Sequence, residues 1–444
     1  MNDLRSVDSG TYPIVDTGQT TYYDDLGNVI SAPASASDSL YGQDAQHEGN
    51  PPSYSVIENG EVVQDHVTGL YWTQSVDWDG VPGVDVNDKL LRTEVDTQVQ
   101  LLNSTAYGDR SDWRVPTVKE LYSLIQFNGI QPRPLASSGA GGEFFLDGSV
   151  FDFSWGDTSA GDRIIDMQVW SSTDYSSTTM VNDSSFLSVN FADGRIKAYP
   201  LAIGATDKEY YAMFVAGNPD YGINALRDNF DGTITDAATG LMWAQADSGL
   251  RMNWEDALAY AQTKNAEAYL GYDDWRLPNA KELQSLVDYS RSPDATGSPA
   301  IDSLFQLSAY DQTAEDFNAL GDYAFHWSGT TFVALDGSDS PDASAAVYVS
   351  FFETLGYFAG DIRDVHGAGS QRTDPKAEGA LASGDFHGPQ GDYISIDNYV
   401  LLTRAIQGVP VPVLPPAAIG LLAALFAGAG AAYTRRKSVP SNEA

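Results

Sequence analysis

The sequence predicts an α+β fold of two tandem, related domains, each with two helices and a small antiparallel sheet, and a C-terminal transmembrane helix. Three observations lead to this prediction. A ten-residue block at residues 112–121 recurs at residues 274–283, and the same order of turn, helix, loop and strand signals surrounds each block. An uncharged apolar run at residues 417–433 adds the transmembrane helix.

The repeat consists of two motifs in the same order. Asp-Trp-Arg-Val-Pro-Thr-Val-Lys-Glu-Leu becomes Asp-Trp-Arg-Leu-Pro-Asn-Ala-Lys-Glu-Leu, and Thr-Gly-Leu-Tyr-Trp-Thr-Gln at 68–74 becomes Thr-Gly-Leu-Met-Trp-Ala-Gln at 239–245. An offset of roughly 160 to 170 residues is that of a whole domain, because solenoid units repeat every 20 to 50 residues. The predicted boundaries are 1–52 for an extended lead-in, 53–225 and 226–408 for the two domains, and 409–437 for a Pro-rich linker, transmembrane helix and basic stop.

An opening hairpin starts each predicted domain. Apolar pairs at 56–57 and 62–63 flank an Asn-Gly turn, and Asp231-Gly232 takes the corresponding place in the second domain. Asn-Gly and Asp-Gly pairs favour tight hairpin turns because they tolerate positive φ.

Two helices follow each hairpin. Apolar residues recur at helical spacing in 90–102 and in 253–261. The repeated block then leads into a second helix through a capping box, in which Thr117 or Asn279 is the N-cap and a Glu follows three residues later.

A long loop rich in Gly and Asp comes next in each domain, at 128–166 and 290–322, and strand-like sequence follows at 186–191 and 347–352. Loops of this length without secondary structure are usually functional.

The composition limits the function classes. The chain has 444 residues, 61 acidic against 24 basic, a net charge of -37 and no cysteine. Nucleic acid is excluded as a partner, because its binding rests on Lys and Arg neutralising phosphates. Disulfides, thiolate metal sites and a cysteine nucleophile are excluded too, and the redox compartment stays open.

The C-terminal segment predicts export. A Pro-rich stretch at 409–416 precedes the apolar run, and Arg435, Arg436 and Lys437 follow it. The positive-inside tendency keeps this basic end cytoplasmic and places the acidic bulk outside the membrane. The segment resembles C-terminal sorting signals of Gram-negative bacteria, which a dedicated protease recognises, so a sorting protease is an expected partner; a permanent anchor or a buried hairpin helix are the alternatives. No signal peptide is visible in residues 1–12.

The repeated motifs, together with Pro-Ile-Val-Asp-Thr-Gly-Gln at 13–19 and Tyr-Gly-Gln-Asp-Ala-Gln at 41–46, resemble a bacterial domain family. This is the domain of unknown function 1566, now named for the C-terminal domain of the Legionella collagen-like adhesin (Lcl). The resemblance implies a C-type-lectin-like fold in both domains and a surface adhesin; the best-known member engages sulfated glycosaminoglycans. The collagen-like stalk is absent here, and Tyr22 and Ala32 stand where family members often carry a cysteine pair.

The paired tryptophans and the residues of the repeated block predict a structural core. The two block arginines could bind a ligand carboxylate, but the identical context in both copies favours an internal bond to a neighbouring Asp or to main-chain carbonyls. The predicted structural residues are Trp72, Trp113, Arg114, Pro116, Trp170, Trp243, Trp275, Arg276, Pro278 and Trp327.

Acidic residues in the first long loop form a candidate calcium site, because hard oxygen ligands on a flexible loop suit Ca²⁺. The alternative is that they only belong to the acidic surface. The candidate ligands are Asp147, Asp152, Asp157, Asp162 and Asp166.

We expect a non-catalytic protein. Asp16-Thr17-Gly18 is similar to the aspartic-protease triplet, but no second copy of it exists to complete a carboxylate pair. The sequence therefore predicts an exported, envelope-anchored recognition or adhesion protein that binds glycans or other surface polymers. The alternative is a structural protein of the cell surface or matrix that assembles with copies of itself.

Overall fold

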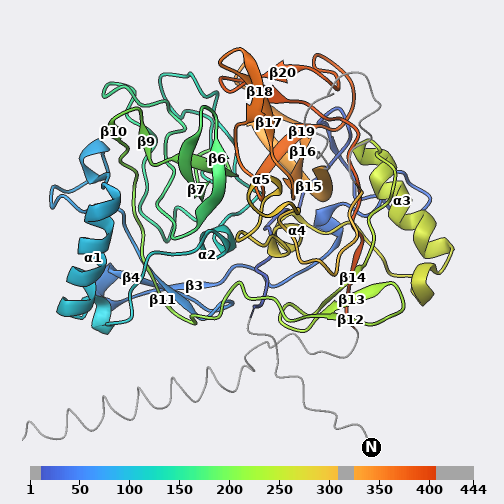
Figure 1. The fold of residues 1–444 in the computed structure, drawn as a ribbon, viewed down its shortest axis with the longest axis horizontal. Coiled ribbons are helices and arrows are strands. Elements are labelled where there is room, and N and C mark those ends of the chain that lie inside the picture. Colours follow the sequence, from blue (N-terminus) through green and yellow to red (C-terminus); the bar gives the residue numbers. More distant parts are fainter. Residues whose placement is uncertain (1–11, 309–324, 407–444) are drawn as a thin grey trace, which may run out of the picture. The chain divides into compact units, whose positions relative to one another are not determined.

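β-strands dominate residues 12–308 and 325–406, the part of the chain that the computed structural model describes (Figure 1). All of these residues belong to one compact unit, Gly10–Ile406. The predicted α+β fold, with two helices and a small sheet in each domain, is therefore wrong. The helices are few and two of them have only six residues, and the largest sheet takes strands from both copies.

The predicted transmembrane helix, with its linker and basic stop, lies outside the described residues. Within 12–308 and 325–406, every helix is too short or too polar to cross a membrane.

The two opening hairpins form as the turn signals predict. Val56 pairs with Val63 across the first turn, where Gly60 has a φ of 97°, and Gly232 has a φ of 88° in the second. Each hairpin belongs to a four-stranded antiparallel sheet whose fourth strand comes from the end of the same copy. The first sheet comprises β3 (Tyr54–Ile57), β4 (Val62–Asp65), β5 (Leu70–Thr73) and β11 (Val215–Gly217); the second comprises β12 (Leu226–Asp228), β13 (Thr233–Asp236), β14 (Leu241–Ala244) and β22 (Thr403–Ala405).

The α-helices of the described residues begin close to the predicted positions. Both predicted capping boxes are confirmed: Thr117 accepts from the Glu120 amide and Asn279 from the Glu282 amide. The short α5 was not predicted. The bounds are α1 (Arg92–Thr105) and α2 (Val118–Ser123) in the first copy, and α3 (Trp254–Ala266), α4 (Ala280–Ser285) and α5 (Pro293–Thr296) in the second.

A six-stranded antiparallel sheet joins the copies. Its order is β15-β16-β19-β8-β7-β6, so three strands of each copy follow one another and the order reads alike from both edges. The join is the pair β8–β19, in which Ile196 lies opposite Gln371. Pairing of these two strands removes an exposed edge that each copy would otherwise present to solvent. The bounds are β6 (Asp174–Thr179), β7 (Asp183–Asn190), β8 (Arg195–Pro200), β15 (Phe325–Leu335), β16 (Pro341–Ser350) and β19 (Gln371–Pro375).

The main apolar core lies between this sheet and the two short helices. Helix α2 packs on β7 and α4 on β16, and the two helices contact each other. Ile196 and Ala198 of β8 are buried in this core. Because side chains alternate along a strand, Lys197 and Tyr199 belong to the opposite face of the sheet.

Short strands complete the described structure. A second four-stranded sheet of the second copy has the order β18-β17-β21-β20, and two hairpins stand apart from the sheets. Their bounds are β1 (Tyr22–Tyr23), β2 (Val29–Ile30), β9 (Ala202–Ile203), β10 (Thr206–Asp207), β17 (Leu355–Phe358), β18 (Asp361–Asp364), β20 (Phe386–His387) and β21 (Asp392–Tyr393).

Candidate functional site

A cavity of about 590 Å³ opens beside β8, on the strand face that carries Lys197 and Tyr199. Its volume is in the range of small-ligand pockets, about 300 to 1,000 Å³. We call it the β8 cavity. It is lined by Arg163, Asp166, Gln168, Met180, Val181, Asp183, Lys197, Ala198, Tyr199, Pro200, Ile203, Gly204, Lys208, Tyr210, Phe358, His366 and Gln390.

The cavity has exposed apolar side chains in its wall. Val181 is 51% exposed and Ile203 is 61% exposed, although both side chains are large and apolar. Apolar walls combined with a few polar groups are the usual composition of a ligand pocket. These two residues therefore offer contact area to a ligand without first having to leave a packed core.

Three charged side chains of the cavity are partly buried and form ion pairs. The Lys197 ammonium pairs with Asp193, and burial lowers the pKa of Lys197 to about 8. Arg163 Nη2 lies 2.7 Å from Asp166 Oδ1. Burial opposes ionisation of Asp166, but the hydrogen bonds and the charge of Arg163 outweigh it and lower the pKa of this carboxyl.

His366 contacts an ion pair of the second copy, formed by Asp392 and Arg372. The His366 Nε2 atom is 2.7 Å from Asp392 Oδ1, and Arg372 pairs with the other Asp392 oxygen. Burial and the neighbouring Arg372 charge lower the pKa of His366 to about 4, so this ring is neutral near pH 7. Asp392 is held ionised because Arg372 and His366 outweigh its burial and lower its pKa.

One buried polar atom in the cavity wall, the Tyr199 hydroxyl oxygen, lacks a hydrogen bond of normal geometry among the described residues. Tyr199 is 8% exposed, and the Asn190 side chain is the polar group beside its hydroxyl. Buried polar atoms are almost always paired, so an orphaned hydroxyl in a cavity wall marks a point where a ligand group can bind.

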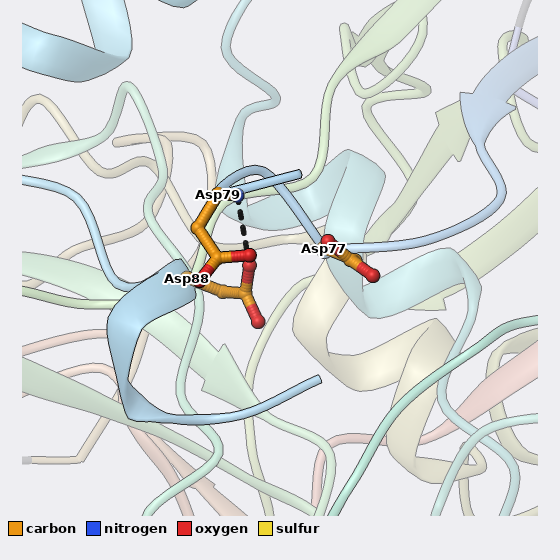
Figure 2. A group of neighbouring side chains, drawn as sticks. All are labelled: Asp77, Asp79 and Asp88. Carbon is orange, nitrogen blue, oxygen red and sulfur yellow. Dashed lines mark hydrogen bonds between the residues drawn. The ribbon is translucent and has the colours of Figure 1, made fainter. Parts of the chain in front are cut away.

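A loop of the first copy carries three carboxylates that lie close together: Asp77, Asp79 and Asp88 (Figure 2). Among the described residues they are the one group of acidic or histidine side chains that meets the geometry of a shared cation. Asp88 is fully buried and accepts from three main-chain amides, those of Trp78 at 2.7 Å, Asp79 at 3.1 Å and Asp85 at 2.8 Å. Its first role is thus to hold the loop in shape.

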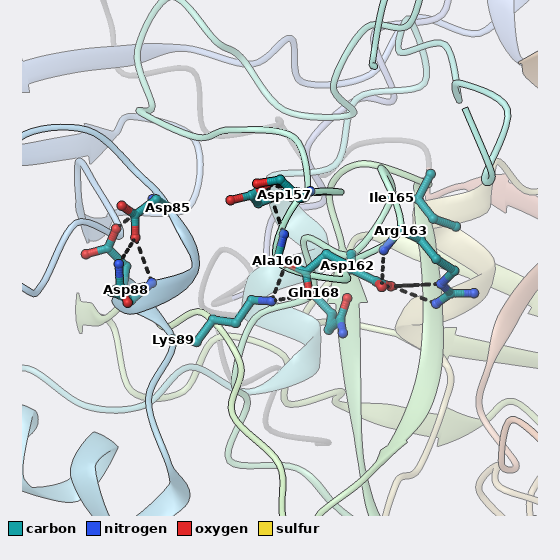
Figure 3. A network of polar contacts seen from close by, with 12 residues as sticks. Asp85, Asp88, Lys89, Asp157, Ala160, Asp162, Arg163, Ile165 and Gln168 are labelled. Carbon is teal, nitrogen blue, oxygen red and sulfur yellow. Dashed lines mark hydrogen bonds and ion pairs between the residues drawn. The ribbon is translucent and has the colours of Figure 1, made fainter. Parts of the chain in front are cut away.

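This acidic loop is tied to the loop that borders the β8 cavity. Lys89 Nζ lies 2.6 Å and 2.7 Å from the two Asp162 oxygens (Figure 3). Arg163 follows Asp162 directly and lines the cavity. The ion pair between Lys89 and Asp162 therefore positions one wall of the β8 cavity.

The repeated block has the same surroundings in both copies. The indole N–H of Trp113 donates to the Tyr107 carbonyl at 2.9 Å, and that of Trp275 donates to the Tyr269 carbonyl at 2.8 Å. The Pro116 carbonyl accepts from the Ser172 amide at 2.8 Å, as the Pro278 carbonyl does from the Gly329 amide. The tryptophans predicted as structural are all buried: Trp72, Trp113, Trp170, Trp243, Trp275 and Trp327.

The block arginines bond internally, to main-chain carbonyls as predicted and to a Glu in place of the predicted Asp. Arg276 forms two hydrogen bonds of 2.6 Å with Glu282, the capping-box residue of α4. Arg114 pairs with Glu120 and donates to the Asn218 carbonyl. These arginines therefore fix the entry of each helix, and neither lines the β8 cavity.

The model of the Lcl C-terminal domain family matches the chain twice, at residues 61–216 and 232–365. The chain belongs to the Lcl C-terminal domain family. Both predicted copies are thereby confirmed. Searches of curated proteins and of solved structures give no match.

The structure does not gather the predicted calcium ligands of the first Lcl C-terminal domain copy into one set. Asp162 and Asp166 pair with Lys89 and Arg163. Asp147 and Asp157 instead accept hydrogen bonds from Ser149 and Ser159 in local turns, and Asp152 accepts from Ser75 at 3.2 Å. Calcium binding by these five residues stays a prediction.

Sequence reasoning missed the β8 cavity of this Lcl C-terminal domain protein. Its residues come from the first long loop, from the β6–β7 turn, from β8, from the β9–β10 hairpin and from the second copy. The alternation Arg195-Ile196-Lys197-Ala198-Tyr199 was the available signal, because an apolar face and a charged face alternate along it. No sequence pattern near β8 indicated that His366, a residue of the other copy, would line the same cavity.

Proposed function

We propose that this protein is an extracytoplasmic recognition or adhesion protein that binds a glycan or another surface polymer in the β8 cavity without chemical turnover. Membership of the Lcl C-terminal domain family suggests a surface, adhesin-like protein. The observation that carries the rest of the proposal is the β8 cavity itself, which combines exposed apolar walls with the orphaned Tyr199 hydroxyl.

The cavity chemistry suits a neutral or mixed-charge sugar. Two of its charged lining residues are neutralised by ion pairs, Asp166 by Arg163 and Lys197 by Asp193. Amide side chains of Gln168 and Gln390 add donors and acceptors for hydroxyl groups. The exposed side chains of Val181 and Ile203 supply apolar contact area for a sugar ring.

A glycan array probed with the full chain tests the proposal. We expect saturable binding to a subset of glycans, and at least a tenfold loss of affinity in Ile203→Trp, which narrows the cavity. Ile223→Trp is the matched control, because Ile223 is 58% exposed and does not line the β8 cavity. Binding that Ile203→Trp leaves unchanged would contradict the assignment of the site.

The array also separates the alternative function. A chain that captures no glycan and instead forms concentration-dependent assemblies in light scattering would support a self-assembling structural protein. Repeating the array with and without Ca²⁺ tests the calcium prediction in the same experiment.

A further inference from the structure

A second cavity, of about 690 Å³, lies where the two copies meet. We call it the junction cavity. One wall is formed by Val118, Lys119 and Thr173 of the first copy, and the opposite wall by Asp288 and Tyr289 of the second. The segment 219–226, which links the copies, lies along it.

The equivalent place in the other half of the molecule is filled by the chain itself. There the main chain of residues 15–19 runs beside Lys281, whose Nζ donates to the Asp16 carbonyl at 3.1 Å. The Phe127 amide donates to the Thr17 carbonyl at 2.7 Å, and Gln19 Nε2 donates to the Phe127 carbonyl at 3.4 Å. An extended peptide therefore occupies this position in one half of the molecule.

The threonines at the two places show the difference. Thr330 accepts from the Ala280 amide at 2.9 Å and donates to Asp44 at 2.6 Å, and Thr17 donates to the same Asp44 oxygen at 2.8 Å. Thr173 accepts from the Val118 amide at 3.0 Å in the same way. In the described part of the chain its hydroxyl has no acceptor, because nothing takes the place of Asp44.

A main-chain donor shows the same difference. Tyr289 is the counterpart of Phe127, since each follows its short helix at the same spacing. The residues before them make matching bonds: the Gln126 amide donates at 3.0 Å and the Asp288 amide at 2.9 Å. Yet the Tyr289 amide has no acceptor among the described residues, whereas the Phe127 amide is bonded to the peptide.

We propose that the junction cavity binds an extended polypeptide segment of a partner protein. A main-chain carbonyl of the segment accepts from the Tyr289 amide, and a second oxygen accepts from the Thr173 hydroxyl. Residues 15–19 of the chain show how such a segment is held, because the Thr17 carbonyl accepts from the Phe127 amide at the equivalent place. In the junction cavity the Gly222 carbonyl and Asn224 Oδ1 of the linking segment accept from Lys119 at 3.0 Å, and neither accepts from the Tyr289 amide or the Thr173 hydroxyl. This inference is independent of glycan binding in the β8 cavity.

The probe is a synthetic peptide with the sequence of residues 13–19, acetylated and amidated at its ends, titrated into the full ¹⁵N-labelled chain. We expect saturable shifts of the Tyr289 amide resonance, and no shift with a scrambled peptide. Ile223→Trp places a large side chain in this cavity and is expected to weaken binding at least tenfold. Ile203→Trp, in the β8 cavity, should leave peptide binding unchanged.

Three results of the peptide titration would overturn the proposal. They are the absence of saturable shifts, shifts centred on Phe127 instead of Tyr289, and equal binding by Ile223→Trp. Dimers of the full chain that Ile223→Trp abolishes would also overturn it, because the occupant would then be a second copy. The two tryptophan variants make this failure distinguishable from failure of the glycan site.

Discussion

Lys119 and Lys281, which hold the same position in the repeated block, each donate a hydrogen bond to a main-chain carbonyl of the other copy. Lys119 Nζ lies 2.8 Å from the Ser285 carbonyl oxygen, and Lys281 Nζ lies 2.9 Å from the Ser123 carbonyl oxygen. The two serines are also equivalent, so the contact repeats itself when the copies are exchanged, as in an isologous interface. The lysine of each block therefore joins the copies and does not await a ligand.

These lysines predict a rise of stability with pH. Burial lowers the pKa of Lys119 to about 8 and that of Lys281 to about 7. Between pH 7 and 9 the unfolded chain keeps both protons while the folded chain releases them, so the free energy of unfolding increases. For Lys281 the increase is roughly 2 kcal/mol, at about 1.4 kcal/mol per pKa unit. Urea unfolding of the wild type and of Lys281→Met at pH 7 and pH 9 measures this increase. An equal change in the free energy of unfolding between the two pH values in both proteins would contradict the prediction.

The two capping-box glutamates predict opposite responses to acid. Burial raises the pKa of Glu120, whereas Arg276 outweighs the burial of Glu282 and lowers its pKa. Ionised Glu282 thus contributes stability that is present above its unfolded pKa and is lost as the pH falls through its folded pKa. Glu282→Gln should flatten the loss of stability between pH 6 and 3, and Glu120→Gln should steepen it. Urea midpoints of both variants across this range provide the measurement, and a shared response would refute the contrast.

Removal of Arg276 tests the same pair at neutral pH. Arg276→Met leaves Glu282 buried without its cation, which typically costs about 3 to 5 kcal/mol. Arg114→Met should cost less, because Arg114 is 30% exposed where Arg276 is 15% exposed. Chemical unfolding of both variants at pH 7 gives the comparison; an equal cost would show that the bidentate geometry of Arg276 contributes nothing.

Replacement of Asp88 by Asn is predicted to loosen the acidic loop locally. Its carboxylate accepts from three amides, and an Asn side chain offers one acceptor oxygen in place of two. Asp88→Asn should lower stability by about 1 to 3 kcal/mol, the usual cost of unpaired buried donors. Hydrogen exchange of the Trp78, Asp79 and Asp85 amides should speed up, while Asp79→Asn, on an exposed side chain, serves as the control. Unchanged exchange in Asp88→Asn would rule out this role.

The joined sheet predicts the behaviour of a single copy. Residues 53–225 expressed alone present β8 as an open edge, and an unpaired edge strand tends to pair with another chain. We expect this fragment to form dimers or larger assemblies at concentrations where the full chain is a monomer. Light scattering after size-exclusion chromatography distinguishes the two, and a stable monomeric fragment would show that the copies fold independently.

Features that depend on neighbouring residues were predictable. The hairpin turn at Gly60 and the N-caps Thr117 and Asn279 follow from local φ preferences and from capping geometry, and all three are present. Joining of the copies was not predictable, because Ile196 and Gln371 lie far apart in sequence and neither residue type signals an edge.

The lead-in at 1–52 shows the same limit. Its polar composition predicts an extended segment, yet Thr17, Gln19 and Asp44 are buried and bond to residues of the two copies. From sequence alone a polar side chain is expected to be exposed to solvent. Its burial becomes evident only when its hydrogen-bond partners elsewhere in the chain are known. Gln19, for example, donates at 2.8 Å to the carbonyl of Thr331 and accepts from its amide. The candidate cavities depend on such long-range contacts and could not be derived from one strand or loop.

The mirror-like strand order of the large sheet constrains how such a gene can change. A deletion that removed β15, β16 and β19 would leave β8 without β19, its neighbour in the sheet. A protein that contains both halves therefore cannot easily lose one half. Loops outside the shared strands take no part in this pairing. Substitutions in those loops therefore leave the shared frame of the sheet unchanged.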